Sequence, residues 1–138
     1  MSRGMIHHIE IYVDDLEKSR QFWGWLLKEL GYMPFQNWDK GFSFKLKDSY
    51  LTFVQTDEKY KDIPYHRCRT GLNHLAFHAG SRQDVDEITQ KLRAGKGKVL
   101  YEDKHPFAGG PDYYAVFFED PNRIKVEIVA PENVNPLI

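Results

Sequence analysis

Apolar and polar side chains alternate along residues 6–13, which is the pattern of a half-buried β-strand. One face of this strand carries three β-branched residues, Ile9, Ile11 and Val13. The opposite face carries an imidazole, a carboxylate and a phenol, from His8, Glu10 and Tyr12. If a helix covers the apolar face, the three polar groups point away from that helix, toward solvent or a cleft.

A helix is expected next, because the apolar positions after this strand recur at helical spacing. The capping-box pair Asp14 and Glu17 marks its start, and Gly31 follows its end near Leu30. Its mostly apolar stripe consists of Leu16, Ser19, Phe22, Trp23, Leu26, Leu27 and Leu30. Three apolar runs separated by turn-like residues then predict strands near residues 32–38, 42–46 and 50–55.

The same order of elements returns after the polar stretch 56–70, which we interpret as a linker or a flap. Residues 72–79 alternate as the first strand does, with His74, Ala76 and His78 on one face. A second capping box and a second helical stripe follow, formed by Ser81, Asp84, Val85, Ile88 and Leu92. Further strands are expected over residues 98–101, 113–119 and 123–129.

The chain therefore contains two copies of one β-α-β-β-β module, about residues 5–57 and 72–130, and the expected fold class is α+β. His8 and His74 occupy equivalent places, on the first strand of each copy. A chain of 138 residues suits a single domain built from two such modules.

Three groups that commonly bind metal ions share one orientation in these modules. Glu127 lies on the non-apolar face of the last strand, as His8 and His74 do on theirs. Two imidazoles and one carboxylate suit Zn, Fe, Mn, Ni or Co, and they leave coordination positions open for water and substrate. Each residue alone is more often an ordinary surface group, but the three together on matching strands predict a divalent metal site.

Charge and cysteine content narrow the possible partners. The formal net charge is −1 and no basic block occurs, so nucleic acid is a poor candidate. The single cysteine, Cys68, rules out an intramolecular disulfide framework and suits a reducing compartment. No signal peptide is evident, and no apolar run approaches the roughly 20 residues that span a bilayer. We therefore expect a cytoplasmic protein with no membrane partner.

Three segments carry a family resemblance: HHIEIYVDDLEKSRQFW, GLNHLAFHA and FFEDPNRIKVEI. They resemble the glyoxalase/bleomycin-resistance/dioxygenase superfamily, also called vicinal oxygen chelate (VOC) proteins, over about Met5 to Pro131. The last segment is the most specific, with its aromatic pair, Asp-Pro turn and glutamate-bearing strand. The resemblance implies that the paired modules curl into an open barrel of mixed sheets with helices outside, around a divalent metal. It maps the metal ligands onto His8, His74 and Glu127.

The chain departs from glyoxalase I-like members of this family at one position. Those members have a fourth ligand, a glutamate on the last strand of the first module, which also serves as a base. The corresponding strand here is SYLTFVQ, where Thr52 is the closest equivalent and Tyr50 and Gln55 lie nearby. The missing carboxylate counts against glutathione-dependent glyoxalase activity. The three-ligand set is similar instead to that of extradiol dioxygenases and fosfomycin-resistance thiol transferases.

The resemblance implies a metal-dependent enzyme that acts on a small oxygen-rich substrate, of the lyase/isomerase, dioxygenase or thiol-transferase type. The metal would act as a Lewis acid. Besides Glu127, the candidate catalytic residues are those that share a face with the ligands, namely Glu10, Tyr12, His78 and Lys125. The Gly- and Pro-rich loop His105–Asp112 is a candidate mobile edge of the site.

Two other functions fit the same pattern. One is a metal-free small-molecule or drug-binding protein like the bleomycin-resistance members, and the other is a structural relative with a vestigial site. The presence of the three metal-binding residues ranks the enzyme first. The resemblance also implies a homodimer, in which modules pair within one chain or between chains.

Overall fold

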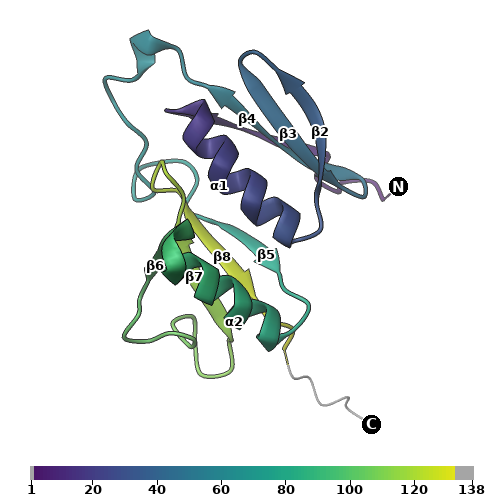
Figure 1. Ribbon diagram of the computed structural model, residues 1–138, viewed down its shortest axis with the longest axis vertical. Coiled ribbons are helices and arrows are strands. Elements are labelled where there is room, and N and C mark those ends of the chain that lie inside the picture. The colour runs from purple at the N-terminus through teal and green to yellow at the C-terminus, as the bar shows by residue number, and fades with distance from the viewer. Residues whose placement is uncertain (1, 133–138) are drawn as a thin grey trace. The chain divides into compact units, whose positions relative to one another are not determined.

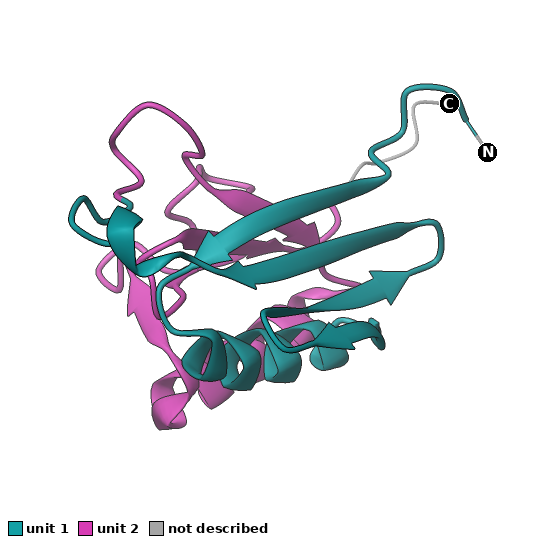
Figure 2. Cartoon of the chain, turned by 90° about the horizontal axis from the view of Figure 1, so that it is seen from above, with its two compact units in different colours: residues 1–65 teal, residues 66–138 magenta. Residues whose placement is uncertain are grey.

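The chain is built from two compact units that divide between Tyr65 and His66 (Figure 2). The computed structural model describes residues 2–132. Each unit contains the elements β-α-β-β-β in that order, with one four-stranded mixed sheet. The expected α+β class and the repeated module are therefore confirmed.

The first unit contains one long helix and four strands (Figure 1). In chain order the elements are β1 (His8–Val13), α1 (Leu16–Glu29), β2 (Met33–Trp38), β3 (Gly41–Leu46) and β4 (Ser49–Gln55). The strand order in the sheet is β1-β4-β3-β2, with β1 parallel to β4 and the other pairs antiparallel. A short 3₁₀ helix, Glu58–Tyr60, follows.

Helix α1 buries the stripe that its sequence predicts. Phe22, Trp23, Leu26 and Leu27 are buried, and the ring of Trp23 stacks on that of Phe53 from β4 with centroids 4.9 Å apart. Burial of large apolar side chains is the main favourable term in folding such a unit. Helix α1 therefore covers one face of the sheet, and His8 and Glu10 lie on the opposite face.

The start of α1 corrects one expectation. The residue that caps the helix is Asp15 and not Asp14, because the Asp15 carboxylate accepts a hydrogen bond from the backbone N–H of Lys18. Gln55 also holds this end of the helix. Its side-chain oxygen accepts from the N–H of Leu16, and its amide donates to the carbonyl of Asp14. Gln55 is therefore committed to the fold and is not free to act as a ligand.

The second unit repeats the topology with shorter strands. Its elements are β5 (Leu75–His78), α2 (Arg82–Lys91), a π-helical turn (Leu92–Lys96), β6 (Lys98–Leu100), β7 (Ala115–Glu119) and β8 (Lys125–Val129). The strand order is β5-β8-β7-β6, and β5 and β8 are parallel. Ser81 caps α2 as expected, by accepting from the N–H of Asp84.

The strand ends of the second unit differ from the sequence-based expectation. His74 lies just before β5, and Tyr113 and Tyr114 lie just before β7. Strand β6 stops at Leu100, because Tyr101 has a left-handed backbone with φ 55°. Strand β8 starts at Lys125, after a turn in which the Asp120 carboxylate accepts two backbone N–H groups.

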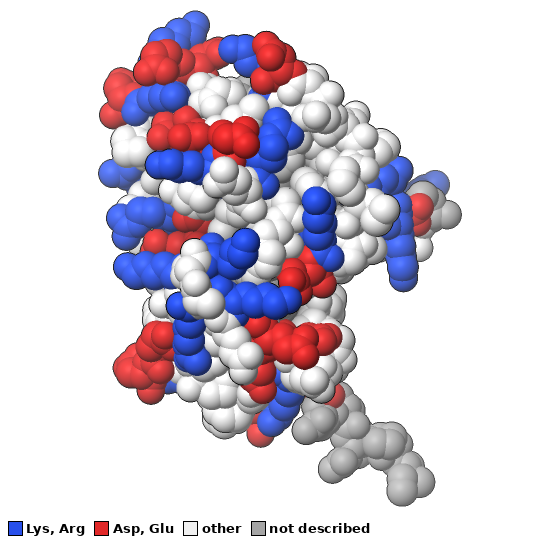
Figure 3. All heavy atoms as spheres, viewed as in Figure 1, with Lys and Arg blue, Asp and Glu red and all other residues white. Residues whose placement is uncertain are grey.

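The described surface carries both signs of charge. In the face shown in Figure 3, lysine and arginine side chains alternate with aspartate and glutamate. Within the described residues, no helix combines the length and the apolar character that crossing a membrane requires.

Candidate functional site

The parallel strand pair at one edge of each sheet, β1 with β4 and β5 with β8, places the residues that the sequence singled out. In the first unit Glu10 on β1 lies beside Thr52 on β4. In the second unit Ala76 on β5 lies beside Glu127 on β8. Glu10 follows His8 by two residues, as Ala76 follows His74. Thr52 therefore has the same place in its module as Glu127 has in the second.

His74 and Glu127 come together in the second unit. The Nε2 atom of His74 lies 3.4 Å from Oε1 of Glu127. The glutamate is only 3% exposed, whereas the His74 side chain is 35% exposed. Glu127 sits in the middle of β8, between β5 and β7, where ladder hydrogen bonds on both sides fix its backbone. A buried carboxylate thus faces a more accessible imidazole.

The other oxygen of Glu127 has a partner that sequence reasoning missed. The hydroxyl of Tyr113 donates a short hydrogen bond to Oε2 of Glu127. Burial, and after it this hydrogen bond, raises the pKa of Tyr113 from 10.0 to about 12. The phenol therefore remains a protonated donor throughout the neutral range. The sequence placed Tyr113 at the start of an expected strand, residues 113–119, but it did not reveal this contact, because the pairing of side chains on different strands cannot be read from one sequence.

Each candidate ligand histidine is held at Nδ1 by the residue before it. His74 Nδ1 lies 2.7 Å from Oδ1 of Asn73, and a carbonyl oxygen can only accept, so Nδ1 carries the proton. His8 Nδ1 lies 2.9 Å from Nδ1 of His7. In both modules the other ring nitrogen, Nε2, faces a carboxylate, from Glu10 in the first unit and from Glu127 in the second. Such outer hydrogen bonds fix the ring orientation of histidines that bind metals.

The first unit surrounds His8 with two more groups from its sheet. The ring of Tyr50 stacks on that of His8, with centroids 4.7 Å apart and planes at 4°. The Glu10 carboxylate lies 3.9 Å from His8 Nε2 and is 61% exposed. Thr52 is 1% exposed, and its hydroxyl is the one buried side-chain polar atom without a hydrogen-bond partner among the described residues. A bound water or ion is one way in which such a buried hydroxyl is satisfied.

The remaining candidate catalytic residues, Tyr12, His78 and Lys125, are exposed or form other contacts. Tyr12 is 73% exposed at the end of β1, and His78 is exposed at the end of β5. Lys125 shares the face of Glu127, but its ammonium group donates to the Tyr101 hydroxyl at 3.0 Å and lies over the ring of Phe117. The structure therefore unites His74, Glu127 and Tyr113 in one unit, and His8 with Glu10 in the other.

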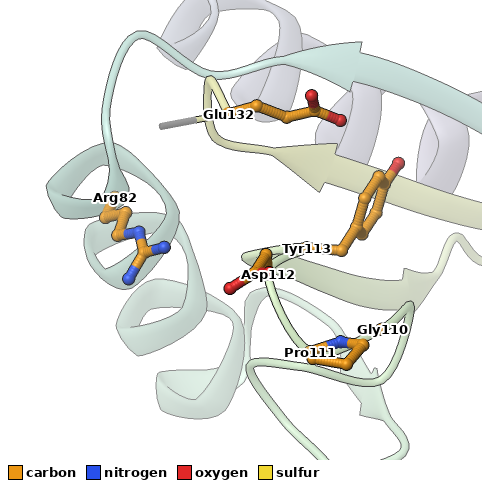
Figure 4. Close-up of a pocket in the computed structure, with 6 residues that line it drawn as sticks. All are labelled: Arg82, Gly110, Pro111, Asp112, Tyr113 and Glu132. Carbon is orange, nitrogen blue, oxygen red and sulfur yellow. The ribbon is translucent and has the colours of Figure 1, made fainter. Parts of the chain in front are cut away.

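A pocket of about 500 Å³ opens beside Tyr113 in the second unit. Its lining residues come from the start of α2, the loop before β7 and the segment after β8: Arg82, Gly110, Pro111, Asp112, Tyr113 and Glu132. Figure 4 shows Arg82 on the helix, facing Asp112 and Tyr113 of the loop before β7, with Glu132 above them. The loop His105–Asp112 thus contributes to this pocket. Tyr113, which also lines the pocket, donates a hydrogen bond to Glu127.

The donor atoms fit a divalent ion by their chemistry. An imidazole Nε2 and a buried carboxylate oxygen in proximity are two ligands of the usual type for transition metals. No group of three such side chains that could hold an ion forms within residues 2–132. The predicted triad takes His8 from the first unit and the other two ligands from the second, so its convergence stays a prediction.

Comparison with known proteins bears on the family. The sequence model described as "Glyoxalase/Bleomycin resistance protein/Dioxygenase superfamily" matches residues 5–128. The "Uncharacterized protein YqjT" of Bacillus subtilis (strain 168) is 61% identical over 126 residues, which cover 91% of this chain and 98% of that protein.

Solved structures agree with this match. A crystal structure of a candidate glyoxalase from Bacillus halodurans is 63% identical, with a TM-score of 0.92, and the match covers 94% of this chain and 97% of that one. The fosfomycin resistance protein FosX from Listeria monocytogenes shares the fold, with a TM-score of 0.66 at 22% identity over 96% of this chain and 97% of that one. With the repeated βαβββ module, these matches show that the chain belongs to the glyoxalase/bleomycin resistance protein/dioxygenase superfamily.

Proposed function

We propose that this chain is an enzyme that uses a divalent metal ion to act on a small oxygen-rich substrate. The observation that carries the proposal is the pairing of His74 Nε2 with the nearly buried carboxylate of Glu127 at 3.4 Å. Burying a carboxylate is costly unless cations or hydrogen-bond donors compensate it. A divalent ion held between these two side chains would supply that compensation.

Four residues would have separate roles in binding the ion. His74 and Glu127 would hold the ion from the second unit, and His8 would hold it from the first. When bound, the ion would act as a Lewis acid toward a carbonyl or a developing negative oxygen of the substrate. Asn73 would keep the His74 ring in the tautomer that presents Nε2, through the contact at Nδ1.

A base is expected on β1 and not on β4. Thr52 offers no carboxylate, but its neighbour across the sheet is Glu10. The exposed Glu10 carboxylate lies 3.9 Å from His8 Nε2, so it is close to one candidate ligand and accessible to substrate. We therefore assign to Glu10 the acceptance of a proton from the substrate. Tyr12, His78 and Lys125 remain candidates for contact with the substrate.

Metal binding by the full-length protein tests the proposal. The purified chain is stripped with a chelator and titrated with Zn²⁺, Ni²⁺, Co²⁺ and Mn²⁺, with Fe²⁺ added under anaerobic conditions. His8→Ala, His74→Ala and Glu127→Gln should each weaken binding by at least about 10-fold, since each removes a ligand. His66→Ala is the matched control, because His66 is a histidine of the second unit that accepts from the N–H of Cys68.

Turnover is then measured with diols, 2-oxoaldehydes, epoxides and acyl-thioesters. If all three ligand variants bind metal as tightly as His66→Ala does, the proposal is wrong. A wild-type chain that binds no metal but still binds a drug-like ligand would instead support the metal-free function.

A further inference from the structure

Tyr113 occupies a position between the loop His105–Asp112 and the candidate metal ligand Glu127. Its hydroxyl donates to Oε2 of Glu127, while Oε1 of the same carboxylate faces His74 Nε2. The two oxygens therefore have different tasks: one is occupied by a phenol, and the other is directed at the imidazole.

We propose that Tyr113 is a positioning residue that holds Glu127 so that a single oxygen, Oε1, is presented to the metal ion. This inference rests on the proposed function. A hydrogen bond to Oε2 occupies a lone pair that a metal would otherwise share in two-oxygen binding. The phenol also fixes the rotation of the carboxylate before any ion arrives, which removes an ordering cost from binding.

The backbone on both sides of Tyr113 is fixed. The N–H of Tyr113 donates to the carbonyl of Gly110 at 3.2 Å, and the N–H of Ala115 donates to that of Pro106 at 3.0 Å. On the strand side, the N–H of Ala130 donates to the carbonyl of Tyr114 at 2.9 Å. The loop and the ends of β7 and β8 thus fix the backbone position from which the Tyr113 side chain extends.

Gly109 determines where that ring can lie. A Cβ atom at Gly109 would stand 2.5 Å from Cδ1 and 3.0 Å from Cε1 of Tyr113, and the shorter of these distances is one at which the ring must shift. The requirement is steric, because the side chain that would collide is the tyrosine itself. The glycine therefore allows the ring to approach the loop closely enough to reach Glu127, and a methyl group at position 109 would displace it.

The experiment measures the dissociation constant of Zn²⁺ in the full-length chain by competition with a chelator. Tyr113→Phe should weaken binding by about 10- to 100-fold, the range found when outer hydrogen bonds to metal ligands are removed. Gly109→Ala should weaken binding as well, although it keeps the hydroxyl, because it moves the ring. Tyr114→Phe is the matched control, because the hydroxyl of Tyr114 donates to Asp86 at 2.5 Å on the outside of α2.

A second measurement separates positioning from a general loss of structure. The visible absorption spectrum of the Co²⁺-loaded chain reports the geometry of its ligands. It should change in Tyr113→Phe and remain the same in Tyr114→Phe. A Tyr113→Phe chain that matches Tyr114→Phe in affinity and spectrum would overturn the inference. If Tyr113→Phe does not fold, Gly109→Ala decides the question by the same two measurements.

The two proposals fail in different ways. If the wild-type chain binds no metal, or if His74→Ala and Glu127→Gln bind it as the wild type does, the proposed function is wrong. If those variants lose the metal while Tyr113→Phe and Gly109→Ala keep the wild-type affinity, the proposed function stands and Tyr113 has no positioning role.

Discussion

Single side chains carry most of the chemistry inferred for this protein, and Glu10 is the one with the most direct catalytic prediction. Glu10→Gln removes the proposed base but keeps the size and polarity of the side chain. We expect kcat to fall by about 10²- to 10⁴-fold, the usual contribution of a general base, while the dissociation constant of the metal changes little. Glu17→Gln, on the solvent side of α1, is the control. A parallel loss of metal affinity would instead make Glu10 a ligand.

Tyr113 leads to a prediction about alkaline pH. Burial and the hydrogen bond to Glu127 raise its pKa to about 12, so folding favours the protonated phenol. Its contribution to the free energy of unfolding is therefore complete below the ordinary tyrosine pKa of about 10 and is lost as the pH rises through about 12. Urea unfolding of the metal-free chain across this range should show the decline. Tyr113→Phe should lack this part of it, whereas replacing the exposed Tyr60 by phenylalanine should not alter it.

Strand periodicity selected the candidate site residues that lie within strands. His8, Glu10 and Glu127 lie within strands, where a period of two assigns each side chain to a face, and that assignment agrees with the structure. The contact of Tyr113 with Glu127 could not be found in this way, because periodicity assigns a side chain to a face but not to a partner on another strand. A further signal was the pair Gly109-Gly110 ahead of Tyr113, whose steric role depends on contacts between residues in three dimensions.

Among the elements, the starts of the two helices were predictable to within a residue or two, and the exact start of α1 can be tested. Asp15→Ala removes the carboxylate that accepts from the N–H of Lys18, and it should lower the free energy of unfolding by about 1 kcal/mol. Asp14→Ala should have a clearly smaller effect. Urea unfolding of the two variants measures the difference, and a larger loss in Asp14→Ala would return the cap to the position that the sequence suggested.

The strand ends were less predictable than the helices for a physical reason. Alternation continues through His74 and through Tyr113, but ladder hydrogen bonds begin only at Leu75 and Ala115. The apolar pattern of a sequence reflects which side chains are buried, whereas the end of a strand is set by where its partner strand stops. In the second unit the short strand β6 pairs with only three residues of β7, so the pattern extends beyond the pairing.

At the scale of the whole molecule, the surface of β2 bears on assembly. This strand lies at the edge of its sheet and exposes Met33, Phe35 and Trp38 by 68%, 48% and 43%. Exposed edges with apolar side chains are usually covered by a partner. We therefore expect a homodimer, with a sedimentation mass twice that of one chain.

Met33→Lys should weaken this association by placing a charge at the edge of the sheet. Met5→Lys is a matched control, since Met5 is also 68% exposed but lies outside the sheet. A wild-type chain that sediments as a monomer at high concentration would contradict the expectation. Equal effects of the two substitutions would place the contact elsewhere.

The unequal residues at equivalent places in the two modules have a consequence for the orientation of a bound substrate. Thr52 offers a neutral hydroxyl where Glu127 offers a carboxylate. An ion held by the proposed triad would take its only anionic ligand from the second module, so the two oxygens of a chelated substrate would meet different surroundings. A substrate whose two adjacent oxygens differ should therefore bind in one preferred orientation, which the identity of the product formed from it would reveal. Thr52→Glu, by adding a carboxylate at the equivalent place, should reduce this preference.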